Sequence, residues 1–171
     1  MRFMKLTLVL TALLTVFVLN GPAGAGQQKI RVLMPPFDAA GGAGLSTLRR
    51  DVMESLATGL AAADVEIAGI EELKELVLKE GVIAFTEERA RGLGVMVKAD
   101  FVLSGALKRG EGSFDMELRL IDLTTGTKAA SYRRSSPSQE ALLDEAGRLA
   151  AHIYRDMLSA RSTRPAVPTS G

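Results

Sequence analysis

Residues 99–126, ADFVLSGALKRGEGSFDMELRLIDLTTG, alternate apolar and polar side chains on both sides of a glycine-bearing turn. Successive side chains of an extended strand point to opposite faces, so this alternation predicts two strands. The segment 109–113 joins them as a hairpin loop, because glycines favour tight turns between strands. A further turn at 122–128 leads to a third expected strand at 129–134. This antiparallel meander is the feature that most limits the possible folds of the chain.

Two rows of apolar side chains define the expected inner face of the meander. Each row follows every second residue of its strand, as a sheet with one buried face requires. The first row is Phe101, Leu103 and the small Gly105, and the second is Phe114, Met116, Leu118 and Leu120.

The segment before the meander predicts a parallel start to the sheet. Residues 29–34 (KIRVLM) alternate as a short strand, which Pro35 and Pro36 end because proline cannot donate to a strand ladder. A loop at 37–44 leads to a helix beginning near Ser46, and residues 65–70 form a second expected strand. The apolar stripe of the helix is Leu45, Leu48, Val52, Leu56 and Leu60, at spacings of three and four.

Three further helices are expected. Residues 71–80 (EELKELVLKE) predict a short amphipathic helix, and 86–99 predict another with Thr86 as its cap. Ser136 is the expected cap of the last helix, with Pro137 at its first position and Gln139 completing a capping box. That helix buries an apolar stripe at spacings of three and four: Leu142, Ala146, Leu149, Ile153 and Met157.

The order of elements gives the fold class. We expect an α/β (α+β) domain whose mixed sheet of about five strands begins as parallel β-α-β and continues as an antiparallel meander. Amphipathic helices pack on this sheet. The domain is expected at 26–160, and 161–171 (RSTRPAVPTSG) is interpreted as a flexible tail or linker.

The N-terminal residues predict export. Arg2 and Lys5 precede the apolar run 6–19, and the small residues 23–25 (AGA) offer a cleavage site after Ala25. The run is shorter than the roughly 20 apolar residues that span a bilayer, so a removed signal peptide at 1–25 is favoured over an anchor. The expected location is therefore the periplasm.

Composition narrows the possible functions. The chain has no cysteine, which excludes disulfides and thiolate zinc sites. Cleavage would leave 146 of the 171 residues, with 19 basic and 20 acidic side chains. This near-neutral balance gives no electrostatic reason to expect nucleic acid as a partner. Aromatic residues make up 5% of the chain and tryptophan is absent, so no platform for stacking bases or sugars is indicated.

The glycine-rich loop at 37–44 is the strongest candidate for a ligand site. Gly41, Gly42 and Gly44 precede a helix, where backbone N–H groups can bind an anion. Leu45 follows the last glycine where a Walker loop has lysine, and GGAGLS lacks the third glycine of a dinucleotide fingerprint. A surface loop is the favoured interpretation, and small-ligand or nucleotide binding by Gly41–Gly44 remains the alternative.

No other residues form a catalytic or metal-binding motif. His152 is the one histidine and is interpreted as a boundary residue of the last helix. Ser104 lacks the G-x-S-x-G turn of a nucleophile elbow and is expected to be a strand residue. Asp115, Glu117 and Asp122 do not match a calcium loop, and we interpret them as surface charges, with Arg119 sharing the face of the first two. We therefore expect no enzyme, no cofactor and no bound metal.

Two segments resemble a known family. IRVLMPPFD (30–38) is similar to the apolar strand ending in LPF that opens TolB-like N-terminal domains. KADFVLSGALKRGEGSFDMELRLIDLTTGTKAAS (98–131) is similar to the family's second signature, an ADYVLxG strand followed by a hairpin and a RLVDxxTG strand end. The resemblance spans about residues 29–158. The doubled proline and the glycine-rich loop depart from the family pattern, and no lipoprotein cysteine, β-propeller or barrel is present.

The resemblance implies a function without catalysis. The family includes the N-terminal domain of TolB and related domains in flagellar and curli-secretion envelope proteins. Similar domains precede the barrel-assembly modules in some outer-membrane assembly proteins of the BamA type. The implied function is a periplasmic protein–protein interaction module of the bacterial cell envelope, in outer-membrane assembly or a Tol-like system. The implied partners are other envelope proteins, including outer-membrane complexes with which it associates peripherally.

Overall fold

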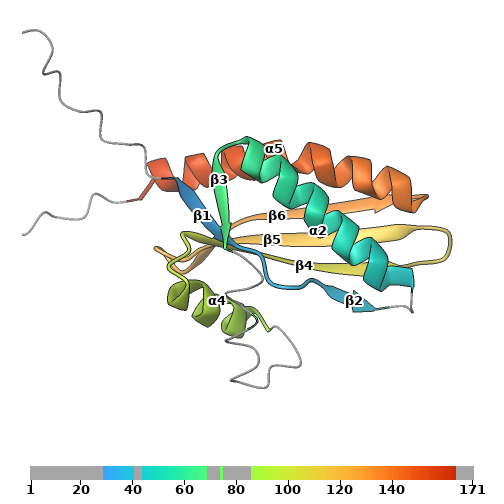
Figure 1. The fold of residues 1–171 in the computed structure, drawn as a ribbon, viewed down its shortest axis with the longest axis horizontal. Coiled ribbons are helices and arrows are strands. Elements are labelled where there is room, and N and C mark those ends of the chain that lie inside the picture. Colours follow the sequence, from blue (N-terminus) through green and yellow to red (C-terminus); the bar gives the residue numbers. More distant parts are fainter. Residues whose placement is uncertain (1–28, 41–43, 69–73, 75–85, 165–171) are drawn as a thin grey trace, which may run out of the picture.

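A computed structural model describes residues 29–40, 44–68, 74 and 86–164 of the chain. The described part is a mixed six-stranded sheet with helices on both faces (Figure 1). The elements in chain order are β1 (Ile30–Leu33), β2 (Asp38–Ala40), α2 (Gly44–Ala62), β3 (Val65–Ala68), α4 (Glu87–Met96), β4 (Phe101–Arg109), β5 (Phe114–Asp122), β6 (Thr127–Ser136) and α5 (Gln139–Ser162).

The sheet has the predicted combination of parallel and antiparallel strands. Its order is β3-β1-β4-β5-β6, and β2 pairs with β4 beside this path. β1 runs parallel to β3 and β4, with α2 as the crossover between β1 and β3. β4, β5 and β6 form the antiparallel meander. The predicted fold class is therefore confirmed.

β2 was not predicted, because 37–44 was interpreted as a loop. Its three residues pair in parallel with Ala106–Lys108 of β4, beyond the point where β1 pairs with Val102. The chain thus separates from β4 at Pro35 and Pro36 and then pairs with the same edge of β4 again through β2. Three small or polar residues carry no recognisable alternation, so this strand exists because of its partner and not because of its own sequence.

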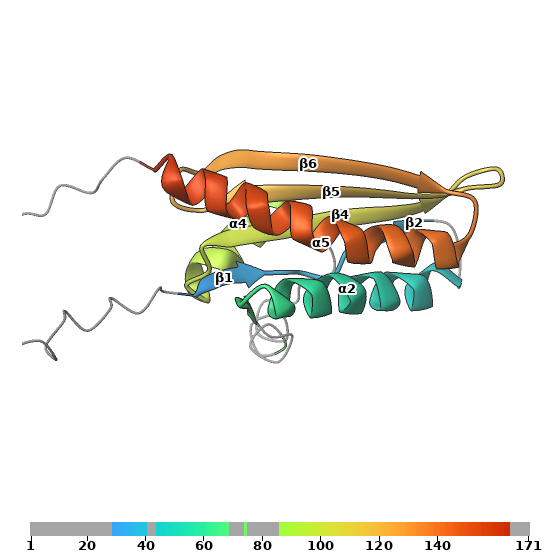
Figure 2. The same cartoon turned by 90° about the horizontal axis from the view of Figure 1, so that it is seen from above.

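Two apolar layers hold the helices to the sheet. The larger cluster joins α2 and α5 to one face, which we call the inner face, and the rows of β4 and β5 predicted to be apolar lie in it. Figure 2 shows both helices lying along this face. The smaller cluster joins α4 to the opposite face through Leu93, Val102 and Ile121, among others. Most of the core therefore lies beneath α2 and α5.

The contact between Phe37 and Gly105 explains why the segment 30–38, which resembles the LPF strand end, has a phenylalanine after its prolines. Phe37 is 1% exposed, and a Cβ added at Gly105 would lie 2.9 Å from its ring and 2.6 Å from Leu118 Cδ2. Only a residue without a side chain fits between these two groups. The phenylalanine after the prolines therefore packs directly on the β4 backbone.

The start of α5 differs from the sequence-based expectation. Ser138 is the cap, and its Oγ accepts a hydrogen bond from the Ala141 N–H at 3.1 Å. Ser136 is unavailable for this role because it ends β6, pairs with Phe114 and is 4% exposed. Pro137 therefore precedes the cap, and Gln139 is the first helical residue and not part of a capping box. The predicted apolar stripe of α5 is confirmed.

Other element boundaries shift by a few residues. α2 begins at Gly44 instead of Ser46, and Thr86 caps α4 as predicted, accepting from the Arg89 N–H. α5 continues to Ser162, so the expected tail at 161–171 begins within the helix. The predicted signal peptide lies outside the described residues, as does the helix at 71–80 apart from Lys74.

Candidate interaction surface

The face of the sheet opposite α2 and α5 is only partly covered. α4 packs against it near β1 and the start of β4, and no helix among the described residues packs over the remainder. We call this remainder the open face. Strand register places three adjacent rows on it, which are Lys108–Asp115–Ser135, Ala106–Glu117–Arg133 and Ser104–Arg119–Ser131.

Charges of both signs alternate across the open face. Arg119 Nη2 lies 3.3 Å from Glu117 Oε1, and Arg133 Nη2 lies 3.4 Å from the same oxygen. Arg119 also reaches Glu87 of α4, which in turn pairs with Arg91. Hydrogen bonds from Arg119 and Arg133, together with their charges, hold the pKa of Glu117 below its usual value. The result is a chain of five paired charges from α4 to β6.

Shallow hollows lie between these charges. One of about 350 Å³ is lined by Pro35, Pro36, Ser104 and Arg119, among other residues. Another of about 640 Å³ lies between Glu117, Lys128 and Arg133. Ser104 and Ala106 provide room because their side chains are small. The open face is therefore polar, uneven and partly exposed.

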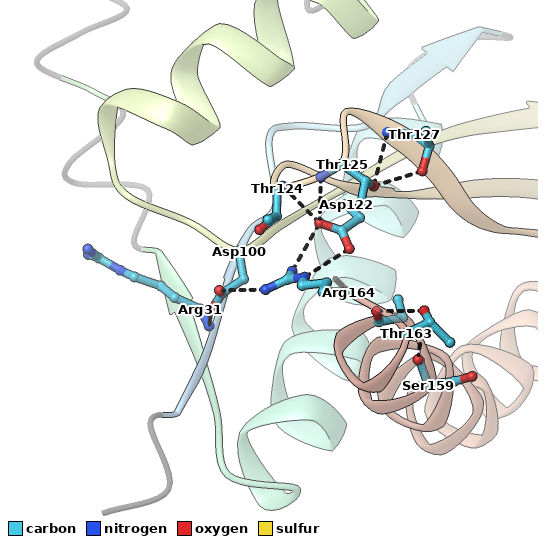
Figure 3. Close-up of polar contacts among 10 residues, drawn as sticks. Arg31, Asp100, Asp122, Thr124, Thr125, Thr127, Ser159, Thr163 and Arg164 are labelled. Atoms are coloured by element: carbon cyan, nitrogen blue, oxygen red, sulfur yellow. Dashed lines mark hydrogen bonds and ion pairs between the residues drawn. The ribbon is translucent and has the colours of Figure 1, made fainter. Parts of the chain in front are cut away.

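Asp115 and Glu117 lie on the open face as predicted, whereas the expectation for Asp122 is wrong. Asp122 is 2% exposed and lies at the end of β5 (Figure 3). Its Oδ1 accepts from the Thr124 N–H at 2.8 Å and from Arg164 Nη2 at 3.0 Å, and its Oδ2 accepts from Arg164 Nε at 3.1 Å. The alternation could not show this, because the neutralising arginine is 42 residues away.

Arg164 is the important residue that sequence analysis missed. It follows α5, lies 5.1 Å from the centroid of the Phe101 ring, and is 3.5 Å from Asp100 Oδ1. It was assigned to the expected flexible tail. No local signal indicated its role, because Arg164 follows the helix and its partners Asp100 and Asp122 lie far away in the sequence. We call Asp100, Asp122 and Arg164 the clasp.

The other predicted candidates do not come together. Ser104 lies on the open face, whereas His152 is exposed on α5, on the other side of the sheet. Gly41 and Gly42 lie outside the described residues, and Gly44 begins α2. Within the part of the chain that the structure describes, no group of three or more potential ligand residues could hold a metal ion.

Two further hollows lie away from the open face. A groove of about 790 Å³ beside the start of α2 is lined by Met34, Met53, Ile67, Arg49 and Arg50, among others. A polar notch of about 280 Å³ lies between the β5–β6 turn and the end of α5, with Asp156 and Thr127 in its lining. In neither hollow do the described residues form a recognisable catalytic arrangement.

The structure belongs to a class of small α+β domains with a mixed sheet, two helices along one face and a shorter helix on the other. Neither a family model nor a curated protein matches this sequence. The C-terminal domain of LpoB from Escherichia coli matches with a TM-score of 0.53 and 15% identity over 64% of this chain and 83% of that chain. Lipoprotein GNA1162 from Neisseria meningitidis matches with a TM-score of 0.54 and 18% identity over 78% and 99% of the chains.

A part of TolB from Acinetobacter baumannii also has this fold. It matches with a TM-score of 0.51 and 13% identity, covering 78% of this chain and 29% of that chain. At these identities the comparisons show a shared fold. The resemblance to TolB therefore holds at the level of the fold, for the part of TolB that is matched. No helix in the described residues is long and apolar enough to span a membrane.

Proposed function

We propose that this chain is an exported, non-enzymatic protein–protein interaction module of the bacterial cell envelope. The observation that carries the proposal is the open face, a polar surface of three strands that the described helices leave uncovered. Ion pairs connect Arg119, Glu117 and Arg133 across this face, and the Arg133 side chain remains largely exposed at its β6 side. The fold shared with LpoB and TolB supports an envelope setting.

Two finer parts of the proposal rest on the sequence. The apolar run at 6–19 and the small residues at 23–25 support export and cleavage after Ala25. A role in outer-membrane assembly or in a Tol-like system follows from the family resemblance. Mass spectrometry of the protein released by osmotic shock tests the export step. The expected chain begins at Gly26, and protein that keeps residues 1–25 in a cytoplasmic fraction contradicts it.

Photocrosslinking in living cells tests the interaction itself. A photoreactive residue at Ser131, exposed on the open face, should give a discrete adduct with another envelope protein. The matched control is Thr58, exposed on α2 at the other side of the molecule, which should give none. If positions on the open face, the sheet edges and the helices all fail to give a protein adduct, the proposed function is wrong.

The groove beside the start of α2 favours a second candidate function, the binding of a small ligand or nucleotide. Arg49 and Arg50 line it together with Ser46 of the first turn of α2, so an anionic small ligand or nucleotide could contact this end of the helix. This hypothesis predicts that phosphate compounds raise the melting temperature and that replacing Gly42 with a bulky residue removes the effect. Unchanged melting across a nucleotide panel would end it.

A further inference from the structure

The outer edge of the sheet at β6 is long and accessible. β6 has ten residues and pairs with β5 on one side, and no other strand of the described chain pairs with it. α5 packs over the inner face beside it, through hydrogen bonding of Tyr132 to Asp156 and the ion pair of Arg134 with Glu145. An edge strand presents unpaired N–H and C=O groups to which another strand can add. Helix α5 therefore packs beside β6 on the inner face, and no described strand occupies the outer edge.

A bulge defines the part of the edge that is regular. Ala130 lies opposite Leu120 and Lys128 lies opposite Ile121, so Ala129 is the extra residue. A bulge bends the strand and interrupts the ladder. The uninterrupted edge therefore runs over 130–136, which accommodates an added strand of about seven residues.

The two sides of this edge differ in charge. β6 carries Lys128, Arg133 and Arg134 and no acidic residue. The Arg133 side chain is 82% exposed on the open face and shares Glu117 with Arg119. On the inner face, the cation of Arg134 is already paired with Glu145. Net positive charge is therefore available on the open-face side of the edge.

We propose that the outer edge of β6 accepts an extended acidic segment of another protein as an additional strand. The acidic side chains occupy alternate positions on the open face, where the central one lies next to Arg133. A second copy of this chain fits less well, because pairing β6 with β6 brings together two strands that carry only positive charges. This inference rests on the proposed function and identifies the surface and the chemistry of the partner.

Synthetic peptides test strand addition directly. The probe is the capped heptapeptide TEVDVET, its matched control is TKVKVKT, and the protein is expressed from the full coding sequence. We expect TEVDVET to bind at least tenfold more tightly, as measured by fluorescence anisotropy. We also expect it to slow hydrogen exchange of amides within 130–136, as measured by NMR. Two versions N-methylated at alternate residues separate strand pairing from charge attraction, because only one of them should lose binding.

Charge reversal tests the role of Arg133. Arg133→Glu should weaken TEVDVET binding at least tenfold and strengthen binding of TKVKVKT. Arg50→Glu is the matched control, because this exposed arginine on α2 lies on the inner-face side of the sheet and should leave both affinities unchanged.

Several results would overturn the inference. These are the absence of TEVDVET binding at 1 mM, equal binding of both N-methylated peptides, protection mapped outside β6, or a dimer in which β6 pairs with β6. If the peptides fail while Ser131 still crosslinks to an envelope protein, strand addition is wrong and the interaction function stands. If no position crosslinks to a protein, the proposed function itself fails.

Discussion

At the scale of single residues, we expect substitutions in the clasp to lower the free energy of unfolding more than substitutions of other polar groups. Asp122 is almost fully buried, and Arg164 supplies two of its hydrogen bonds. Asp122→Ala should lower the free energy of unfolding by about 3 kcal/mol, because it leaves a largely buried guanidinium without its main partner. Urea denaturation of Asp122→Ala, Arg164→Ala and the double variant measures the coupling, which should be about 1–3 kcal/mol. Simple additivity of the two single variants would contradict this account.

Gly105 and Gly92 allow a controlled comparison, because an added methyl group is crowded at the first position and free at the second. Gly105→Ala should destabilise the protein by about 1–3 kcal/mol, because the new methyl group would overlap Leu118 and the Phe37 ring. A Cβ at Gly92 in α4 meets nothing within 4 Å, so Gly92→Ala should stabilise the helix by up to about 1 kcal/mol. Thermal melting distinguishes the two, and equal effects would show that packing over Gly105 is looser than described.

Tyr132 should make stability depend on alkaline pH. Burial, and then its 2.5 Å hydrogen bond to Asp156, raise the pKa of Tyr132 above its ordinary value of about 10. The unfolded chain therefore loses this proton first, and the contribution of Tyr132 to stability is complete below about pH 10 and falls as the pH rises. Compared with Tyr132→Phe, the wild-type protein should lose up to about 1.4 kcal/mol more per pH unit above pH 10.

Urea denaturation at pH 9, 10 and 11 measures this difference. A Tyr154→Phe background isolates the phenolate absorbance of Tyr132, since these are the two tyrosines of the chain. That absorbance should rise together with unfolding. Ionisation of Tyr132 near pH 10 in the folded protein would contradict the effect of burial.

At the scale of elements, the N-cap of α5 is Ser138 in the structure, whereas the sequence pattern predicted Ser136. Ser138→Ala should lower the free energy of unfolding by about 1 kcal/mol, because it removes the acceptor for the Ala141 N–H. Ser135→Ala is the control and should change it by less than about 0.5 kcal/mol, because Ser135 is exposed. Chemical denaturation measures both, and an equal loss in the two variants would argue against Ser138 as the cap.

The elements that could be predicted are those whose own periodicity is strong. The meander, α2 and the apolar stripe of α5 each repeat over several turns or alternations, so local pattern and tertiary packing agree. β2 and the partners of Asp122 depend on residues far away in the sequence, which periodicity does not report. The cap was misplaced for a related reason, since pairing with Phe114 keeps Ser136 in the strand.

At the scale of the whole molecule, the open face and the β6 edge could be located only after the helices were placed. Alternation put Asp115, Glu117 and Arg119 on one face, but nothing local indicated that α4 would cover only part of that face. The fold class, in contrast, follows from the order of elements, because a helical crossover and tight hairpins leave few topologies.

The clasp also brings the two ends of the described domain together. Asp100 Oδ2 accepts from the Arg31 N–H at 2.9 Å, while Asp100 Oδ1 lies 3.5 Å from Arg164. The loop at 110–113 lies at the far end of the sheet (Figures 1 and 2).

A circular permutant that links residue 164 to residue 29 with about eight glycine and serine residues, and opens between Glu111 and Gly112, should still unfold cooperatively. Circular dichroism during urea titration measures this, and a permutant without a cooperative transition would contradict it. An attachment next to residue 29 or residue 164 would accordingly fix the same end of the molecule. The opposite end, with β2 and the loop at 110–113, would then point away from the point of attachment.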